Sequence, residues 1–140
     1  MRKTSILPAI VAGCVIVGLA GCASMSKGPS DNDLIQDLLN EWKSATEAKN
    51  LDGMMDCFSQ EFRGEDGGKE EMRAFLAAFI DKGNLDGAKV DLEKAETIID
   101  GATASVLSIR LSSTAGSIGI DFDLRKEADG AWRIIRLSGT

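Results

Sequence analysis

Beyond residue 30, apolar residues recur every three or four positions, a spacing that is typical of amphipathic helices. Ser30 followed by Asp33 is a helix-capping pair, so a first helix is predicted from residue 31 to about Lys49. Asn50 caps a second helix over residues 51–62, and a third helix follows a glycine-containing turn and ends at Gly83. The apolar positions of the three helices are Leu34, Ile35, Leu38, Leu39, Trp42, Ala45, Ala48, Leu51, Met54, Met55, Phe58, Phe62, Met72, Phe75, Leu76, Phe79 and Ile80.

From residue 88 onward the pattern changes to short β-type runs separated by turn residues. Asp100-Gly101 and Asp129-Gly130 are two-residue hairpin signals, because both positions of such a turn need a positive φ. A third turn is predicted over residues 113–116. The four predicted strands are residues 89–99, 102–113, 117–127 and 131–138, and they form an antiparallel meander.

The turns also predict which residues lie opposite each other. Taking Asp129-Gly130 as a two-residue loop places Leu124 opposite Ile135, and Phe122 opposite Leu137. A middle turn centred on Thr114-Ala115 and a first loop at Asp100-Gly101 then give one common apolar face. The predicted inner face comprises Val90, Leu92, Leu107, Ile109, Leu111, Ile118, Ile120, Phe122, Leu124, Ile135 and Leu137.

The opposite face of the predicted sheet is half charged and half apolar. Asp91 lies across from Arg110, and Asp123 across from Arg136, so that half is expected to face solvent. The other half forms an apolar patch of a kind that often mediates association. We therefore expect a homodimer through the sheet, with a candidate dimer face made by Ile99, Val106, Trp132 and Ile134.

Three N-terminal helices packed on a curved four-stranded antiparallel meander sheet make an α+β domain, predicted to span residues 31–140. The part of the chain before it has a different pattern. Arg2 and Lys3 precede an apolar run that ends in small residues, the order of a secretory signal peptide. The run is shorter than the ~20 residues that a transmembrane helix needs.

Leu19-Ala20-Gly21-Cys22 at the end of this run resembles the bacterial lipoprotein signal. The resemblance implies that residues 1–21 are a signal peptide, that Cys22 is acylated, and that residues 22–30 are a flexible tether. Ala23 differs from the aspartate that retains lipoproteins at the inner membrane. The expected location is the cell envelope, on the periplasmic side of the outer membrane in a Gram-negative cell, with lipid on Cys22 as the membrane anchor.

Charge and cysteine content agree with such a protein. The formal net charge is −6, and removal of Arg2 and Lys3 would take it to −8, which disfavours nucleic acid as a partner. Of the three cysteines, only Cys57 would remain a free thiol, so no intrachain disulfide is expected and stability must come from the core.

The run from Ile35 through Trp42, Asn50-Leu51-Asp52 and Phe58, together with the ending Asp129-Gly130-Ala131-Trp132, resembles the nuclear transport factor 2-like superfamily. That resemblance implies a cone with a pocket between the helices and the concave sheet. Core packing is the alternative role for each apolar candidate, and a β-bulge could turn Lys94 and Glu96 to solvent. The candidate pocket-lining residues are Trp42, Met54, Phe58, Met72, Phe75, Lys94, Glu96, Leu107, Ile109 and Phe122.

Enzymes of this superfamily use histidine or tyrosine beside an acid, and the chain has no histidine and no tyrosine. It also lacks a metal-binding motif, a nucleophile triad and a phosphate-binding loop, so no cofactor is expected. We expect a non-catalytic module that binds a small apolar ligand or a protein. One alternative is a carboxylate-dependent isomerase, dehydratase or cyclase of the same fold, and another is a structural or assembly subunit of an envelope complex.

Overall fold

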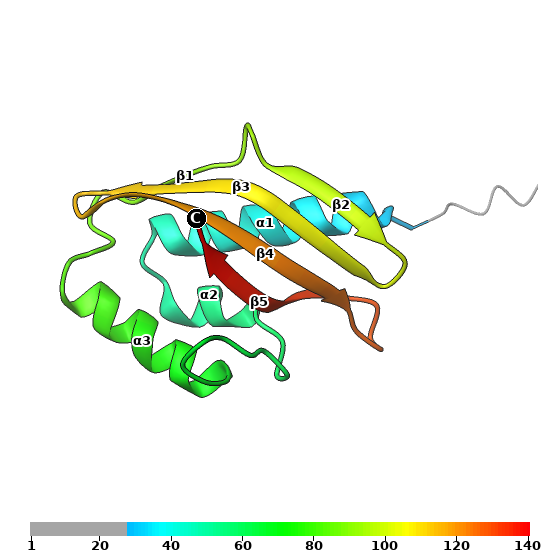
Figure 1. The fold of residues 1–140 in the computed structure, drawn as a ribbon, viewed down its shortest axis with the longest axis horizontal. Helices are drawn as coiled ribbons and strands as arrows, with labels where there is room; N and C mark the ends of the chain where they lie inside the picture. Colours follow the sequence, from blue (N-terminus) through cyan, green and yellow to red (C-terminus); the bar gives the residue numbers. More distant parts are fainter. Residues whose placement is uncertain (1–27) are drawn as a thin grey trace, which may run out of the picture.

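The computed structural model describes residues 28–140, and the elements are labelled in Figure 1. The predicted signal peptide, Cys22 and the tether up to Lys27 lie outside the described residues. Three helices precede all the strands, as predicted. The elements are α1 (Asp31–Glu47), α2 (Leu51–Asp56), α3 (Lys69–Asp81), β1 (Lys89–Asp91), β2 (Glu96–Asp100), β3 (Thr103–Ser113), β4 (Gly116–Lys126) and β5 (Trp132–Gly139).

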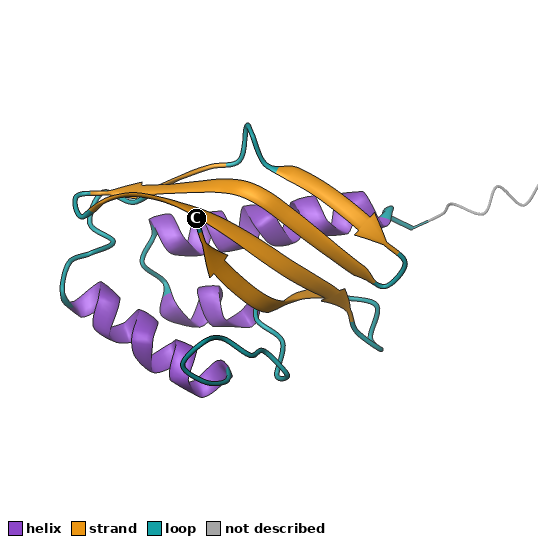
Figure 2. Cartoon of the chain, viewed as in Figure 1, coloured by secondary structure: helices purple, strands orange, loops and turns teal. Residues whose placement is uncertain are grey.

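The helices lie on one side of a curved antiparallel sheet (Figure 2), which confirms the predicted α+β architecture. The strand order is β1-β3-β4-β5, and β2 pairs with the other half of β3. The predicted first strand is therefore two strands, separated by a turn over residues 92–95. Lys94 and Glu96 are both exposed, as expected if this strand is interrupted.

Local capping signals place the first two helices correctly. The Ser30 hydroxyl accepts a bond of 3.2 Å from the Asp33 N–H, and the Asp33 carboxylate accepts one of 3.0 Å from the Ser30 N–H. The Asn50 side chain caps α2 by accepting a hydrogen bond of 3.1 Å from the Gly53 N–H.

The prediction that the second helix continues to residue 62 is wrong. After Asp56 the chain leaves the helix and runs beside β5. The Ile134 N–H donates to the Cys57 carbonyl, and the Ser59 N–H donates to the Ile134 carbonyl, each at 2.9 Å. Pairing with a sheet edge therefore overrides the helical periodicity of this segment.

A β-bulge in β3 corrects the predicted inner face. The middle turn has the predicted register, with Ile109 opposite Ile120, but pairing shifts between Val106 and Ile109. Ser108 in the bulge has a φ of 65°, and its N–H donates a hydrogen bond of 2.9 Å to the Asp121 carboxylate. The extra residue reverses the alternation of side chains, so Val106 is buried and Leu107 is only half-buried.

A second bulge corrects the last hairpin. The Glu127 N–H donates to the Ala131 carbonyl at 2.8 Å, so the loop has three residues with Gly130 at positive φ, and Leu124 pairs with Ile134. A register shift further along β5 restores the predicted pair of Phe122 with Leu137.

These shifts overturn the candidate dimer face. Val106, Trp132 and Ile134 are 0%, 4% and 0% exposed and belong to the core. Ile99 pairs with the buried Ala104 and shares its face, although it is itself partly exposed. The apolar outer patch predicted from these residues is therefore wrong.

Asp31 fixes the start of α1 against the last hairpin. Its carboxylate accepts hydrogen bonds from Lys126 Nζ at 2.8 Å and from Trp132 Nε1 at 3.1 Å. These two bonds hold the pKa of Asp31 below its ordinary value, the Lys126 bond having the larger effect. The pKa of Asp33 is lowered by its bonds with Ser30, and that of Asp129 by its bond with Arg133.

Acid is therefore expected to weaken the fold. A carboxyl group whose folded-state pKa is depressed stabilises the fold above its unfolded-state pKa, and that stabilisation is lost as the pH falls below ~4. The effect of these surface groups is modest. Urea midpoints at pH 7 and pH 3 should differ less in Asp31→Asn than in the wild type. Equal differences in the two proteins would contradict a role for the Asp31 charge.

Candidate functional site

The deep end of the predicted pocket is filled by side chains. Trp42 and Phe122 meet edge to face, with ring centroids 4.9 Å apart. Phe58 packs in the same geometry against Phe62. Of the predicted lining residues, the following are at most 3% exposed and belong to this core: Trp42, Met54, Phe58, Ile109 and Phe122.

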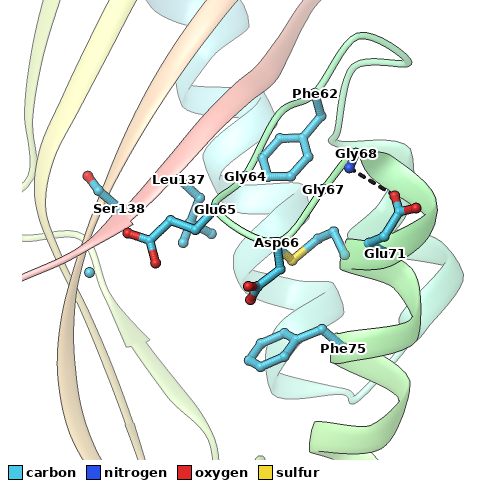
Figure 3. Close-up of a pocket in the computed structure, with 12 residues that line it drawn as sticks. Phe62, Gly64, Glu65, Asp66, Gly67, Gly68, Glu71, Phe75, Leu137 and Ser138 are labelled. Atoms are coloured by element: carbon cyan, nitrogen blue, oxygen red, sulfur yellow. Dashed lines mark hydrogen bonds between the residues drawn. The ribbon is translucent and has the colours of Figure 1, made fainter.

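A cleft of about 200 Å³ lies between α3, the loop over residues 64–68 and the end of β5 (Figure 3). Met72 and Phe75 are the predicted residues that the structure brings together here. Leu107, Lys94 and Glu96 do not contribute to it. The lining residues are Phe62, Gly64, Glu65, Asp66, Gly67, Gly68, Glu71, Met72, Phe75, Leu137, Ser138 and Gly139.

Helix α3 forms the apolar wall of the cleft because it packs only partly on the rest of the domain. None of its residues is fully buried, although Met72, Leu76, Phe79 and Ile80 pack against the core. Phe75 is 56% exposed and stacks on Phe79, with ring centroids 5.6 Å apart. A phenylalanine exposed to this extent beside a cleft is a candidate contact for a partner.

The opposite wall is a loop held by backbone hydrogen bonds. The Gly64 N–H donates to the Gly67 carbonyl at 2.8 Å, and the Gly68 N–H donates to the Glu71 carboxylate at 2.8 Å. Gly67 has a φ of 143°, and a Cβ there would lie 2.7 Å from the Glu71 side chain. Only glycine fits at this position, so the loop geometry is built into the sequence.

The rim of the cleft is acidic. Glu71 is engaged in capping α3, whereas Glu65 and Asp66 make no ion pair or hydrogen bond within residues 28–140. In Figure 3, Glu65 extends toward the end of β5, and Asp66 lies on the side of Phe75. No lysine or arginine among residues 28–140 lines the cleft. An apolar surface beside uncompensated negative charge favours a ligand that has an apolar part and a positive charge.

The other buried chemical groups of residues 28–140 are two hydroxyl groups and one thiol. The fully buried polar side chains of this part of the chain are Thr46 and Ser59, and neither is an acid. Burial raises the pKa of the Cys57 thiol to about 12, and Glu41 and Asp56 add to the rise, so the thiol stays protonated at neutral pH. No group of three or more potential metal ligands is found among residues 28–140. None of the three helices could cross a bilayer.

The sequence matches no family model and no curated protein. Its fold is found in solved structures. An NTF-2-like protein of unknown function from Shewanella oneidensis is 20% identical with a TM-score of 0.63, over 79% of this chain and 98% of that one. A protein of unknown function with a cystatin-like fold from Nostoc punctiforme is 19% identical with a TM-score of 0.62, over 79% of this chain and 91% of that one.

A putative calcium/calmodulin-dependent protein kinase type II association domain from Thiobacillus denitrificans is 18% identical with a TM-score of 0.61, over 74% and 91% of the two chains. At these identities the similarity is one of fold. The sheet order, the helices on one side of the curved sheet and these structures agree, and the chain has the nuclear transport factor 2-like α+β fold.

Proposed function

We propose that this protein is an envelope-anchored lipoprotein whose domain is a non-catalytic module that binds an apolar group of a partner in the cleft beside α3. The observation that supports this most directly is the exposed aromatic surface of Phe75 next to a preformed cleft. Lipid on Cys22 would hold the domain at the membrane, through a tether whose residues 23–30 span at most ~28 Å.

The size of the cleft favours a side chain of a protein partner over a small molecule. Pockets for small molecules commonly measure ~300–1,000 Å³ and enclose most of the ligand. The cleft here is about 200 Å³ and is bounded on one side by a half-exposed helix. It can hold one or two apolar side chains of a larger molecule, with the rest of that molecule outside.

The position of the cleft supports the same function. Helix α1 begins at one end of the domain, and α3 lies in the opposite half (Figure 1). A domain tethered through residue 30 would therefore present the cleft away from its point of attachment. Molecules in the surrounding compartment could reach it.

The two alternative functions have less support in the structure. A carboxylate-dependent enzyme needs a desolvated acid in the cavity, and the buried side chains of residues 28–140 include no acid. An assembly subunit that associates through an apolar outer sheet face needs the patch around Trp132, and Trp132 is 4% exposed.

The test is native mass spectrometry of the protein purified from its own envelope and delipidated. We expect a bound species that Phe75→Ser reduces severalfold, because the substitution removes the aromatic wall of the cleft. Ile98→Ser is the matched control, since Ile98 is 50% exposed on β2 and does not line the cleft. Detergent should be needed to extract the wild type and not Cys22→Ser.

An unchanged bound species in Phe75→Ser would overturn the cleft as the binding site. Equal losses in Phe75→Ser and Ile98→Ser would also overturn it, because both variants would then act through a general effect on the domain. Extraction of the wild type without detergent would overturn the lipid anchor independently.

A further inference from the structure

The outer edge of β5 is covered for only part of its length. Residues 57–63 run beside its first half, where Ile134 exchanges backbone bonds with Cys57 and Ser59. The last of these bonds is from the Arg63 N–H to the Ile135 carbonyl, at 3.1 Å. The chain then turns away into the loop over residues 64–68. Beyond Ile135, no strand within residues 28–140 lies beside this edge of β5.

The uncovered part directs backbone groups into the cleft. Gly119 and Thr140 exchange both of their backbone bonds, at 3.2 and 2.9 Å, so they form a hydrogen-bonded pair of the β4–β5 ladder. Such pairs alternate along antiparallel strands, so Ser138 faces β4 whereas Leu137 and Gly139 direct their N–H and C=O groups away from it. Neither residue makes an outward backbone bond to the described chain, and both line the cleft.

Natural proteins usually prevent an open strand edge from pairing with another chain by placing lysine, proline or a covering segment there. Here the uncovered residues are Leu137, Ser138 and Gly139, which carry no charge and no proline. Unpaired strand groups beside an apolar cleft are the two components of recognition by strand addition, in which backbone bonds give affinity and side-chain pockets give specificity.

We propose that the cleft binds an extended peptide segment of a partner protein, which adds as a strand to β5 at residues 137–139. This proposal rests on the proposed function and specifies its partner. An apolar side chain of the segment would lie against Met72 and Phe75, and a lysine or arginine beside it would face Glu65 and Asp66.

Charge selects this occupant over a second copy of the chain. Glu65 and Asp66 on the rim have no ion-pair partner within residues 28–140, so they complement a basic segment. Two copies joined through their β5 edges would bring both acidic loops together, and the chain already carries a net charge of −6.

The probe is an acetylated hexapeptide of alternating lysine and leucine, titrated to millimolar concentration into the isotope-labelled protein and followed by NMR. Two further peptides separate the contribution of charge from that of backbone hydrogen bonds. One has glutamate in place of lysine, and the other has alternate backbone nitrogens methylated. We expect the first peptide to slow hydrogen exchange at the amides of Leu137 and Gly139. The amide of Ser138, which faces β4, is the internal reference.

Gly139→Pro is the decisive variant, because it removes one outward donor without removing a bond to β4. A Cβ at residue 139 meets nothing closer than the Gly119 carbonyl at 4.0 Å, so Gly139→Ala is a matched control that keeps the donor. We expect Gly139→Pro to bind the lysine peptide about three- to tenfold more weakly than Gly139→Ala. Glu65→Gln with Asp66→Asn should also weaken binding and reduce its dependence on salt.

Failure of the lysine peptide to bind at millimolar concentration would overturn the proposal. The proposal would also be overturned by a combination of two results. Gly139→Pro and Gly139→Ala would bind the lysine peptide equally well, and the methylated peptide would bind as tightly as the unmethylated one. If Phe75→Ser still weakened binding in that case, the cleft would remain a binding site without strand addition, so the two proposals fail separately. Protection of Leu137 and Gly139 that rises with protein concentration in the absence of peptide would identify a second copy as the occupant and also overturn the proposal.

Discussion

Replacing Trp42 by alanine is expected to destabilise the domain by about 3–5 kcal/mol, the usual cost of removing a large buried aromatic side chain. The indole is 3% exposed and packs edge-on against Phe122, between α1 and the centre of the sheet. The loss combines the transfer of apolar surface with a cavity that the surrounding core can fill only in part. Most domains of this size are stable by about 5–15 kcal/mol, so a large share of the stability would be lost.

Urea unfolding followed by circular dichroism measures this change. Fluorescence of Trp132, which remains in the variant, gives a second probe of the same transition. Phe75→Ala is the control, since Phe75 is also aromatic but is 56% exposed, and it should change stability by less than about 1 kcal/mol. Similar urea midpoints for the two variants would contradict the assignment of Trp42 to the core and Phe75 to the open cleft.

The parts of the fold that depend on local signals could be predicted from the sequence. Ser30 with Asp33 and the side chain of Asn50 cap helices at the expected residues, because these hydrogen bonds reach only three residues along the chain. The turn at Thr114-Ala115 has the predicted register for the same reason.

The register far from the turns could not be predicted in the same way. A bulge adds one residue to one strand, and its position depends on curvature and packing across the sheet. In the last hairpin two errors compensate: the loop is one residue longer than predicted, and the register shift in β5 restores the pair of Phe122 with Leu137. The sequence therefore predicts the wrong face for the residues between the loop and the shift, such as Trp132 and Ile134.

The candidate site was predicted in part. Helical periodicity identified Met72 and Phe75 as inward residues of α3, and both line the cleft. The contribution of Leu137 and Gly139 does not follow from the sequence, because the helical pattern extends through residue 62 and gives no sign that this segment pairs with β5. Once that segment is seen to pair with only the first half of β5, the uncovered edge of the second half follows.

Deletion of Ser108 is expected to cost at least about 4 kcal/mol and to abolish the cooperative unfolding transition. Without the extra residue, the side chains of β3 before and after position 108 can no longer both face the core. Val106 is 0% exposed and Ala104 is 5% exposed, and either they or Ile109 and Leu111 would turn outward. Burial of one valine or isoleucine side chain contributes about 1.5–3 kcal/mol, and the pairing of β2 with β3 would shift as well.

Ser108→Gly separates the geometry of the bulge from the chemistry of the serine. Glycine adopts the φ of 65° without strain and keeps the N–H that donates a hydrogen bond of 2.9 Å to Asp121. The free energy of unfolding should therefore stay within about 1 kcal/mol of the wild-type value. Urea unfolding of both variants beside the wild type makes the comparison. A deletion variant that unfolds cooperatively near the wild-type midpoint would show that another part of β3 can take up the missing residue. The burial of both Val106 and Ile109 would then not depend on this bulge.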